Sequence, residues 1–330
     1  MSYPLISVVM PVYNCARYVH EAIESILGQT YRNFEFIIVD DGSTDATPEI
    51  ANEYAERDGR IRVIHQPKSG IPASRNKGIT ESGGEWIFCM DGDDISMPHR
   101  FAVQMEAVEK NPSLILFGGC CRQINAAGTP VRINKYPVRH KDLVNNLETL
   151  RPFFPHSSAC YKRSAVLKAG CYRERFQYAQ DHDLWLRLSL AGEIGCSNKI
   201  VLQLRKHDNN VSDVFFYVQK TKGIAALVCH FRKRFGLSDL YALNEAEWEY
   251  FLAWIGDKLR EYGYFKMRIL EETLSKTLFY KRDSPVILRA GNFIYRAVRR
   301  PHSAFEIIKT RLFGSSLPKR LAEESRQIWP

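Results

Sequence analysis

The first two hundred residues alternate between short apolar runs and segments in which apolar side chains recur every three or four positions. The apolar runs have the length and composition of buried strands, and they cover residues 6–10, 34–39, 61–65, 86–90 and 114–117. The segments between them have helical spacing and cover residues 17–27, 47–57, 73–81 and 98–110. This alternation predicts an α/β fold, in which helices flank a Rossmann-like, mainly parallel sheet.

The pattern changes after residue 213, where aromatic, aliphatic and basic residues are interleaved at helical spacing. We expect two domains: a sheet domain over 1–213 and a basic helical C-terminal region over 214–330. Basic and acidic residues are equal in number in the first domain, so the net charge of +9 belongs to the second, and it is densest between residues 289 and 320. Such asymmetry usually indicates an anionic partner.

Apolar residues among these cations favour an anionic membrane surface over nucleic acid, so we expect peripheral membrane contact and no nucleic-acid partner. Packed helices with solvated basic faces would give the same pattern. No apolar stretch reaches the roughly 18 residues of a spanning helix, and no basic segment precedes an apolar run at the N-terminus. The eight cysteines lack metal-ligand spacing and indicate free thiols. We therefore expect a cytoplasmic protein, or one that lies on the inner face of the cell membrane.

Two groups of carboxylates follow predicted strands. Asp91, Asp93 and Asp94 come directly after the fourth strand, and Asp40 and Asp41 follow the second. In open α/β sheets, ligands bind beyond the carboxyl ends of the parallel strands. Both groups should therefore lie at the edge of the sheet where a ligand would bind.

The chemistry of these carboxylates allows more than one interpretation. Three carboxylates within four residues repel one another unless water or a cation neutralises them, and Mg²⁺ and Mn²⁺ prefer such oxygen ligands. A carboxylate after the second strand can accept hydrogen bonds from a base or a ribose. A solvated turn, capping of the helix after Pro98, or capping of the helix at 47–57 by Asp40, Asp41 or Ser43 would explain the same residues.

A third segment, residues 178–188, joins a Gln-Asp pair to a leucine-rich helix of buried type. Asp181 falls in the first turn of this helix, where the helix dipole stabilises an anion, so capping is one interpretation of it. The other interpretation is a general base, which must lie within hydrogen-bond reach of the proton that it accepts. The sequence leaves both open.

Six motifs, in order, resemble the family 2 inverting glycosyltransferases of the GT-A fold. They are Val8-Val9-Met10-Pro11-Val12-Tyr13-Asn14, Asp40-Asp41-Gly42-Ser43, Ser69-Gly70 with Ser74-Arg75-Asn76-Lys77-Gly78, Asp91-Gly92-Asp93-Asp94, Asp181 with Leu184-Trp185-Leu186-Arg187, and Leu204-Arg205-Lys206-His207 with Ser212. They span residues 6–212, about two thirds of the chain. The resemblance implies transfer of a sugar from a nucleoside-diphosphate sugar, with UDP favoured, to an acceptor hydroxyl in polysaccharide or cell-surface glycan biosynthesis.

The resemblance also implies roles for the matching residues. Pro11, Tyr13 and Asp41 would surround the nucleobase, and Arg75 would reach the nucleotide or its phosphates. The rest of the nucleotide-sugar site would consist of Asn14, Asp40, Asp91, Asp93 and Arg205. Mn²⁺ or Mg²⁺ would bind to Asp93 or Asp94 with His207, for which a lone surface histidine is the alternative. Asp181 would be the catalytic base, and a single base acting opposite the leaving group implies inversion.

Two departures from the family pattern bear on this expectation. Gln180 stands where the family usually has a glutamate, and the loss of that charge should make Asp181 less basic rather than inactive. The Gln-x-x-Arg-Trp motif of processive members is absent, which favours addition of a single sugar.

Other enzyme classes lack their motifs in this chain. A dehydrogenase would have G-x-G-x-x-G after the first strand, and a nucleotidyltransferase would have a basic, glycine-rich phosphate loop between Pro11 and Arg17. The main alternative is a catalytically inactive nucleotide-sugar-binding protein of the same fold, suggested by Gln180. For an active enzyme, the acceptor could be a glycan, a lipid-linked sugar or a protein.

Overall fold

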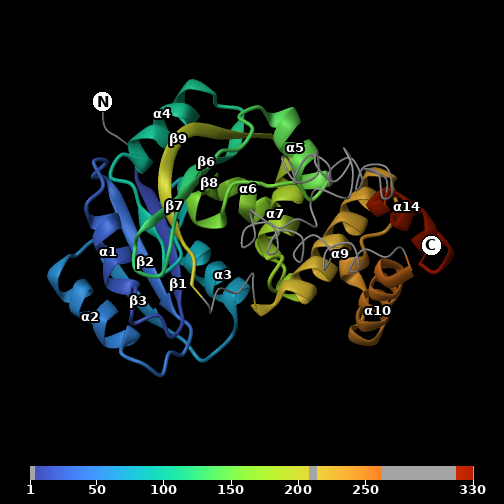
Figure 1. Ribbon diagram of the computed structural model, residues 1–330, viewed down its shortest axis with the longest axis horizontal. Coiled ribbons are helices and arrows are strands. Elements are labelled where there is room, and N and C mark those ends of the chain that lie inside the picture. Colours follow the sequence, from blue (N-terminus) through green and yellow to red (C-terminus); the bar gives the residue numbers. More distant parts are fainter. Residues whose placement is uncertain (1–3, 208–213, 262–316, 330) are drawn as a thin grey trace, which may run out of the picture. The chain divides into compact units, whose positions relative to one another are not determined.

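The computed structural model describes residues 4–207, 214–261 and 317–329 (Figure 1). The chain forms two compact units, residues 1–226 and 227–330. Ser212 of the last motif lies outside the described residues. So do residues 289–316 of the basic stretch at 289–320. The predicted catalytic residues all belong to the first unit.

The first seven elements follow the predicted order. They are β1 (Ile6–Val12), α1 (Val19–Leu27), β2 (Phe34–Asp40), α2 (Thr47–Arg57), β3 (Ile61–His65), α3 (Ile71–Glu81) and β4 (Trp86–Cys89). β1 runs two residues beyond its predicted end and includes Pro11, which has no N–H to donate to a neighbouring strand. The pairing of β1 with β4 ends at Val9 opposite Cys89, so one side of β1 is already unpaired at Pro11.

The elements that follow are predicted only in part. They are β5 (Ile95–Ser96), α4 (Arg100–Lys110), β6 (Leu114–Ile124), β7 (Pro130–Asn134), α5 (His140–Glu148), η1 (His156–Ser158), β8 (Cys160–Lys162), α6 (Arg163–Lys168), η2 (Glu174–Phe176), α7 (Gln180–Ser189) and β9 (Glu193–Arg205). The predicted strand at 114–117 continues through Gly118 and Gly119. A Cβ at either glycine would lie 2.3 Å from a side chain, that of Phe154 or Val201 respectively. The Gly-Gly pair therefore marks a close approach of neighbouring elements rather than the end of a strand.

The nine strands of the described residues form one mixed sheet in the order β3-β2-β1-β4-β8-β6-β9-β5, with β7 paired to β6. β3, β2, β1 and β4 are parallel, as predicted. β8 pairs antiparallel with β4 and β6, and β6 pairs parallel with β9. The carboxyl ends of β2, β1 and β4 lie side by side, so the acidic segments after β2 and β4 meet at one edge of the sheet.

Helices cover both faces of the parallel strands, and Figure 1 shows α1 and α2 on one side and α3 on the other. α1, α2 and α4 contribute to one hydrophobic core cluster with Val8, Phe36 and Phe88 of the sheet. On the opposite face, Gly78 of α3 lies so close to β1 that a Cβ would be 2.3 Å from the side chain of Val9. This close approach packs α3, which carries Arg75, tightly against the central strand.

The second unit is helical over its described residues. α9 (Phe216–Arg234) enters it, followed by η3 (Leu240–Ala242), α10 (Glu245–Glu261), α14 (Leu317–Glu324) and η5 (Ser325–Gln327). Trp248, Phe251 and Trp329 are buried, and the ring of Phe251 contacts both tryptophans. Among the described helices, none is both long enough and apolar enough to cross a membrane.

Candidate active site

The acidic turn (Asp91–Asp94) follows β4 directly. Its shape requires glycine at position 92, because a Cβ there would lie 2.9 Å from Cys15 Sγ. Asp94 is only 2% exposed, and α4 is capped by no carboxylate side chain, since its N-cap residue is His99. Asp94 is therefore not a solvated carboxylate, the turn does not cap α4, and the buried charge must be balanced within the protein or by a ligand.

Asp91 is held by a cation and a hydroxyl. Arg75 Nη2 donates to its Oδ1 at 2.9 Å, and Ser157 Oγ donates to its Oδ2 at 2.8 Å. Burial alone would raise the pKa of Asp91, but the charge of Arg75 and these hydrogen bonds bring it below the usual value. Arg75 is 5% exposed, and its Nε has no hydrogen-bond partner among the described residues. This arginine therefore fixes the acidic turn and keeps one donor unused.

Asp94 shares the same serine. Its Oδ2 lies 2.5 Å from Ser157 Oγ, and its Oδ1 accepts a hydrogen bond from Arg205 N at 2.8 Å. Burial, followed by the charges of Asp93 and Asp91, raises the pKa of Asp94 well above the usual value. Ser157 has one hydroxyl proton for two carboxylates, so a proton on Asp94 completes the network: Asp94 donates to Ser157, and Ser157 donates to Asp91.

Asp93 differs from its neighbours because it faces His207. Its Oδ2 lies 3.0 Å from His207 Nε2, and the imidazole stacks on Tyr18 with ring centroids 5.2 Å apart. The side chain of His207 is 16% exposed. His207 is thus not a lone surface histidine, and its imidazole contacts a carboxylate 114 residues earlier in the chain.

Arg205, at the end of β9, braces the acidic turn. Its backbone N–H donates to Asp94, its Nε donates to Asp93 O at 2.9 Å, and its Nη2 pairs with Glu21 of α1 at 2.8 Å. The residue is 2% exposed. Its guanidinium donates to the protein, so the role in nucleotide-sugar binding that the resemblance implies would be indirect in this conformation.

α4 supplies a buried polar clamp beneath the acidic turn. Arg100 Nη2 donates to Cys89 O at 2.8 Å and to Ala159 O at 3.1 Å, which ties the end of β4 to the segment after Ser157. Gln104 Nε2 donates to Ser158 O at 2.8 Å. Sequence analysis missed this clamp and Ser157. The only sequence signal is a polar His-Ser-Ser triplet between an aromatic pair and a strand, which has no periodicity to reveal it.

Asp41, after β2, organises the loop that leads into α3. Its Oδ1 accepts hydrogen bonds from Gln66 Nε2 and Ser69 N, both at 2.8 Å, and its Oδ2 accepts from Gly70 N at 2.9 Å. Burial opposes ionisation, but these bonds and Lys68 lower the pKa of Asp41 below its usual value. The ammonium of Lys68 lies 3.2 Å from Asp41 Oδ2 and 2.9 Å from the centroid of the Tyr13 ring. Tyr13, which is 45% exposed, thus lies beside Asp41 as the resemblance implies.

The other residues predicted for nucleotide-sugar binding hold loops together. Asp40 Oδ1 accepts from Ser43 N at 3.1 Å, and its Oδ2 pairs with His65. Asn14 has a positive φ of 47° and accepts a hydrogen bond from Thr44 N at 2.7 Å. Pro11 lies in β1. α2 begins after Ala46 without a side-chain cap, so the expectation that Asp40, Asp41 or Ser43 caps this helix is wrong.

Asp181 lies in the first turn of α7 and is half-buried. Its Oδ1 accepts a hydrogen bond from His182 N at 2.8 Å. Burial raises the pKa of Asp181, and the nearby charge of Arg75 offsets only part of this effect. Asp91 also acts on this pKa, which shows that Asp181 lies within electrostatic reach of the acidic turn. In contrast to Asp91 and Asp94, Asp181 has no side-chain hydrogen-bond partner among the described residues.

Next to the base candidate, Gln180 is 6% exposed, and its Oε1 has no hydrogen-bond partner within the described parts of the chain. α7 is fixed farther along by Arg187, which pairs with Asp183 of the same helix and donates to Ala169 O at 2.5 Å and Cys171 O at 2.8 Å in the segment before it. The helix start that carries Gln180 and Asp181 is therefore rigidly held without engaging the Asp181 carboxylate.

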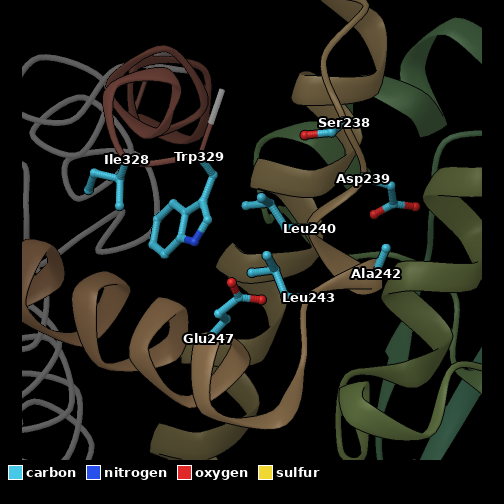
Figure 2. A pocket seen from close by; sticks show the side chains of 8 residues that line it. All are labelled: Ser238, Asp239, Leu240, Ala242, Leu243, Glu247, Ile328 and Trp329. Atoms are coloured by element: carbon cyan, nitrogen blue, oxygen red, sulfur yellow. The ribbon is translucent and has the colours of Figure 1, made fainter.

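A separate pocket of about 380 Å³ lies in the second unit (Figure 2). Its lining consists of Ser238, Asp239, Leu240, Ala242, Leu243, Glu247, Ile328 and Trp329. Its two carboxylates already have structural roles: Asp239 accepts from Tyr241 N at 3.0 Å, and Glu247 accepts from Asn244 N at 3.0 Å at the start of α10. The pocket has none of the features of the site in the first unit.

Comparison with known proteins agrees with this geometry. The family described as glycosyl transferase family 2 matches residues 7–170, about half of the chain. An uncharacterized glycosyltransferase of Haemophilus influenzae is 29% identical over 232 residues, which cover 66% of this chain and 70% of that protein. EpsJ of Bacillus subtilis, also an uncharacterized glycosyltransferase, is 42% identical over 120 residues, or 36% of this chain and 35% of its own. Several curated relatives are matched over only about a third of their length.

Solved structures share the fold. The crystal structure of S. aureus TarS 1-349 in complex with UDP superimposes with a TM-score of 0.56 at 18% identity, over 98% of this chain and 91% of that one. The mannosyltransferase PcManGT from Pyrobaculum calidifontis, in complex with GDP-Man and Mn²⁺, gives 0.51 at 16% identity, over 100% of this chain and 88% of that one. The mixed sheet with its flanking helices is the GT-A fold. The chain belongs to glycosyltransferase family 2, as its motifs predict.

Proposed function

We propose that this glycosyltransferase moves a sugar from a nucleoside-diphosphate sugar, preferably a UDP-sugar, to an acceptor hydroxyl with inversion at the anomeric carbon. The environment of Asp181 carries the proposal. Its carboxylate has a raised pKa, lies within electrostatic reach of Arg75 and Asp91, and has no side-chain partner among the described residues. A carboxylate of this kind is suited to accept a proton during the reaction.

In the proposed donor complex, the nucleobase lies on Tyr13 beside Asp41. Asp41 would accept a base N–H in place of one of its present donors, and Lys68 would leave the face of Tyr13. Arg75 would use its unpartnered Nε toward the nucleotide, and Asp91 would contact the ribose. Pro11, Asn14 and Asp40 would act by shaping the pocket, and Arg205 by bracing the acidic turn.

The donor set beside Asp93 fits a divalent cation. The Asp93 carboxylate and the His207 imidazole lie 3.0 Å apart. Mn²⁺ binds both types of ligand, and Mg²⁺ prefers the carboxylate oxygen. The described residues contain no group of three His, Cys, Asp or Glu side chains that could hold a metal, so diphosphate oxygens and water would complete the shell. Both Asp94 oxygens are already engaged, which favours Asp93 and His207 over Asp94. A bound ion would stabilise the charge on the departing diphosphate.

The chemical step then needs one base. The acceptor oxygen attacks the anomeric carbon from the face opposite the diphosphate, and a new glycosidic bond forms as the bond to the diphosphate oxygen breaks. Asp181 accepts the proton of the acceptor hydroxyl, which contributes about 10²–10⁴-fold to the rate. The nucleoside diphosphate leaves with the electron pair. No covalent enzyme intermediate is required.

A screen for released nucleotide tests the proposal directly. The purified protein is incubated with UDP-, GDP- and dTDP-sugars, with and without Mn²⁺, and the anomeric configuration of any product is read by NMR. We expect metal-dependent release from a UDP-sugar and inversion in the product. Retention would contradict the mechanism. Binding of the donor without any turnover would favour the catalytically inactive alternative, for which Gln180 is the supporting observation.

We also propose that the protein works at an anionic membrane surface in polysaccharide or cell-surface glycan biosynthesis. In the second unit, the exposed Arg326 lies over the 37%-exposed ring of Phe235, with Cζ 5.4 Å from the centroid, and the exposed Lys319 lies 5.3 Å from the centroid of the buried Phe231. Cations beside apolar rings suit a lipid headgroup region. Sedimentation with anionic liposomes at low and high salt is the test, and no binding at either would remove this part of the proposal.

A further inference from the structure

Two aromatic rings lie face to face, and one of them belongs to the segment just before α7, the helix that carries Asp181. The rings of Tyr178 and Phe215 have centroids 4.1 Å apart and planes inclined by 8°. Tyr178 precedes Asp181 by three residues, and Phe215 immediately precedes α9. Phe215 is 36% exposed. An exposed apolar ring, stacked on a residue three positions before the proposed base, indicates a contact surface for a ligand.

The backbone holds Tyr178 in an unusual conformation. Its φ is +77°, in the left-handed region that aromatic residues rarely adopt. The carbonyl of Tyr178 accepts a hydrogen bond from Gln219 Nε2 of α9 at 2.9 Å. The segment before α7 and the start of α9 are therefore joined twice, once through the backbone and once through the stacked rings. This arrangement fixes the orientation of the ring pair relative to Asp181.

The same segment also reaches the donor pocket. A Cβ on Gly70 would lie 3.4 Å from Gln177 Nε2, so the amide of Gln177 lies against the loop whose N–H groups bind Asp41. Residues 177–181 therefore run from the proposed nucleotide pocket, past the ring pair, to the proposed base. A molecule on the ring pair would lie next to both the donor and the group that takes its proton.

The geometry points to an acceptor subsite, in which a sugar ring of the acceptor packs its C–H face on the Tyr178–Phe215 pair. This inference rests on the proposed transfer reaction and names the acceptor as a carbohydrate. A pyranose has an apolar C–H face and a polar rim, which matches the exposed outer face of Phe215 in the stack, with the amide of Gln177 and the carboxylate of Asp181 on the same chain segment as Tyr178. The hydroxyl presented to Asp181 loses its proton to that carboxylate as its oxygen bonds to the donor sugar.

Substitution of Phe215 tests the subsite. The acceptor probes are the methyl β-glycosides of glucose, galactose, mannose and N-acetylglucosamine, and donor hydrolysis without acceptor is measured in parallel. Phe215→Ala and Phe215→Leu should raise the acceptor KM about ten-fold, because both remove the flat ring, while Phe215→Tyr keeps wild-type values. Donor hydrolysis should not change in any of them. Tyr250→Ala, which removes an exposed, ring-contacting aromatic of the second unit, is the matched control and should have no effect.

Saturation-transfer NMR with the same glycosides, in the presence of UDP and Mn²⁺, reports binding without turnover. We expect saturation of the C–H protons of at least one glycoside with the wild type and its loss with Phe215→Ala. No saturation with any glycoside would overturn the subsite, as would equal acceptor KM values for the alanine variant and the wild type. Binding of octyl but not methyl glycosides would also overturn it, since an alkyl chain would then be the ligand. Absence of donor hydrolysis in the wild type would instead count against the proposed function.

Discussion

The carboxylates of the acidic turn and the carboxylate of Asp181 lie within electrostatic reach of one another, yet the protein treats them in opposite ways. Asp91 is surrounded by Arg75 and Ser157, and Asp94 by Ser157 and the backbone of Arg205. Asp181 has only a backbone donor at hydrogen-bond distance among the described residues. Side-chain partners fix Asp91 and Asp94 in place, whereas the Asp181 carboxylate has no such partner in the described part of the chain and is free to meet an acceptor hydroxyl. The comparison separates the carboxylates that the protein holds in place from the one that we propose as the catalytic base.

Asp181→Asn should have the largest effect, because it removes the proposed base and changes little else. We expect turnover to fall by about 10³-fold with an unchanged donor KM, as measured by nucleotide release. Asp183→Asn is not a suitable control, because Asp183 anchors Arg187. Asp58→Asn, in a turn after α2, should leave turnover unchanged. An Asp181→Asn enzyme with wild-type turnover would contradict the assignment of the base.

The same substitution should change stability in a pH-dependent way. Burial raises the pKa of Asp181 in the folded protein above its value in the unfolded chain. Below the pKa of Asp181 in the unfolded chain, the carboxyl is protonated in both states and does not change the free energy of unfolding. As the pH rises through the interval between the two values, the folded state loses stability relative to the unfolded state and does not regain it. Asp181→Asn should therefore have a higher Tm than the wild type at neutral pH and an equal Tm at acid pH. A lower Tm at neutral pH would contradict the raised pKa.

Asp93→Asn should have the next largest effect. The substitution keeps a hydrogen bond to His207 but removes the anionic oxygen proposed for the cation. We expect turnover to fall about 10²-fold, with saturation only at higher Mn²⁺ concentration. Donor hydrolysis measured across a Mn²⁺ series is the test. An unchanged Mn²⁺ dependence would show that Asp93 does not bind the ion.

Ser157→Ala should have a smaller effect, because Ser157 positions the acidic turn without touching the substrate. Removing its hydroxyl leaves two carboxylate oxygens without their shared partner, which should cost about 1–3 kcal/mol of stability and reduce turnover roughly ten-fold with a shifted Mn²⁺ dependence. Ser158→Ala is the matched control, since Ser158 is equally buried but donates to Pro155 O at 2.8 Å. A similar loss of stability and of turnover in both variants would make Ser157 a purely structural residue.

The parallel half of the sheet could be predicted from sequence because its strands are uninterrupted apolar runs separated by helices with clear periodicity. The full length of β6 and the strands after it could not, because Gly118 and Gly119 interrupt the pattern of β6 and the antiparallel partner β8 is only three residues long. Motifs located Asp41, Asp93 and Asp181, since each follows a recognisable strand or begins a helix. The partners that hold the acidic turn come from distant positions: Ser157 lies 66 residues beyond Asp91. Only the folded chain reveals such contacts.

Gln180→Glu should have the smallest effect, and it sharpens the comparison between partnered and unpartnered carboxylates. Gln180 is 6% exposed and its Oε1 has no partner among the described residues. A glutamate there would add negative charge next to Asp181 and raise the pKa of that carboxylate further, which would move the acid limb of kcat/KM to higher pH by about half a unit. The new buried charge should also lower the Tm at neutral pH, because it must be desolvated beside the Asp181 carboxylate. The test is the pH profile of kcat/KM, with Gln180→Ala as the uncharged control. An acid limb at the same pH in Gln180→Glu and the wild type would mean that the ionisation of Asp181 does not determine this limb.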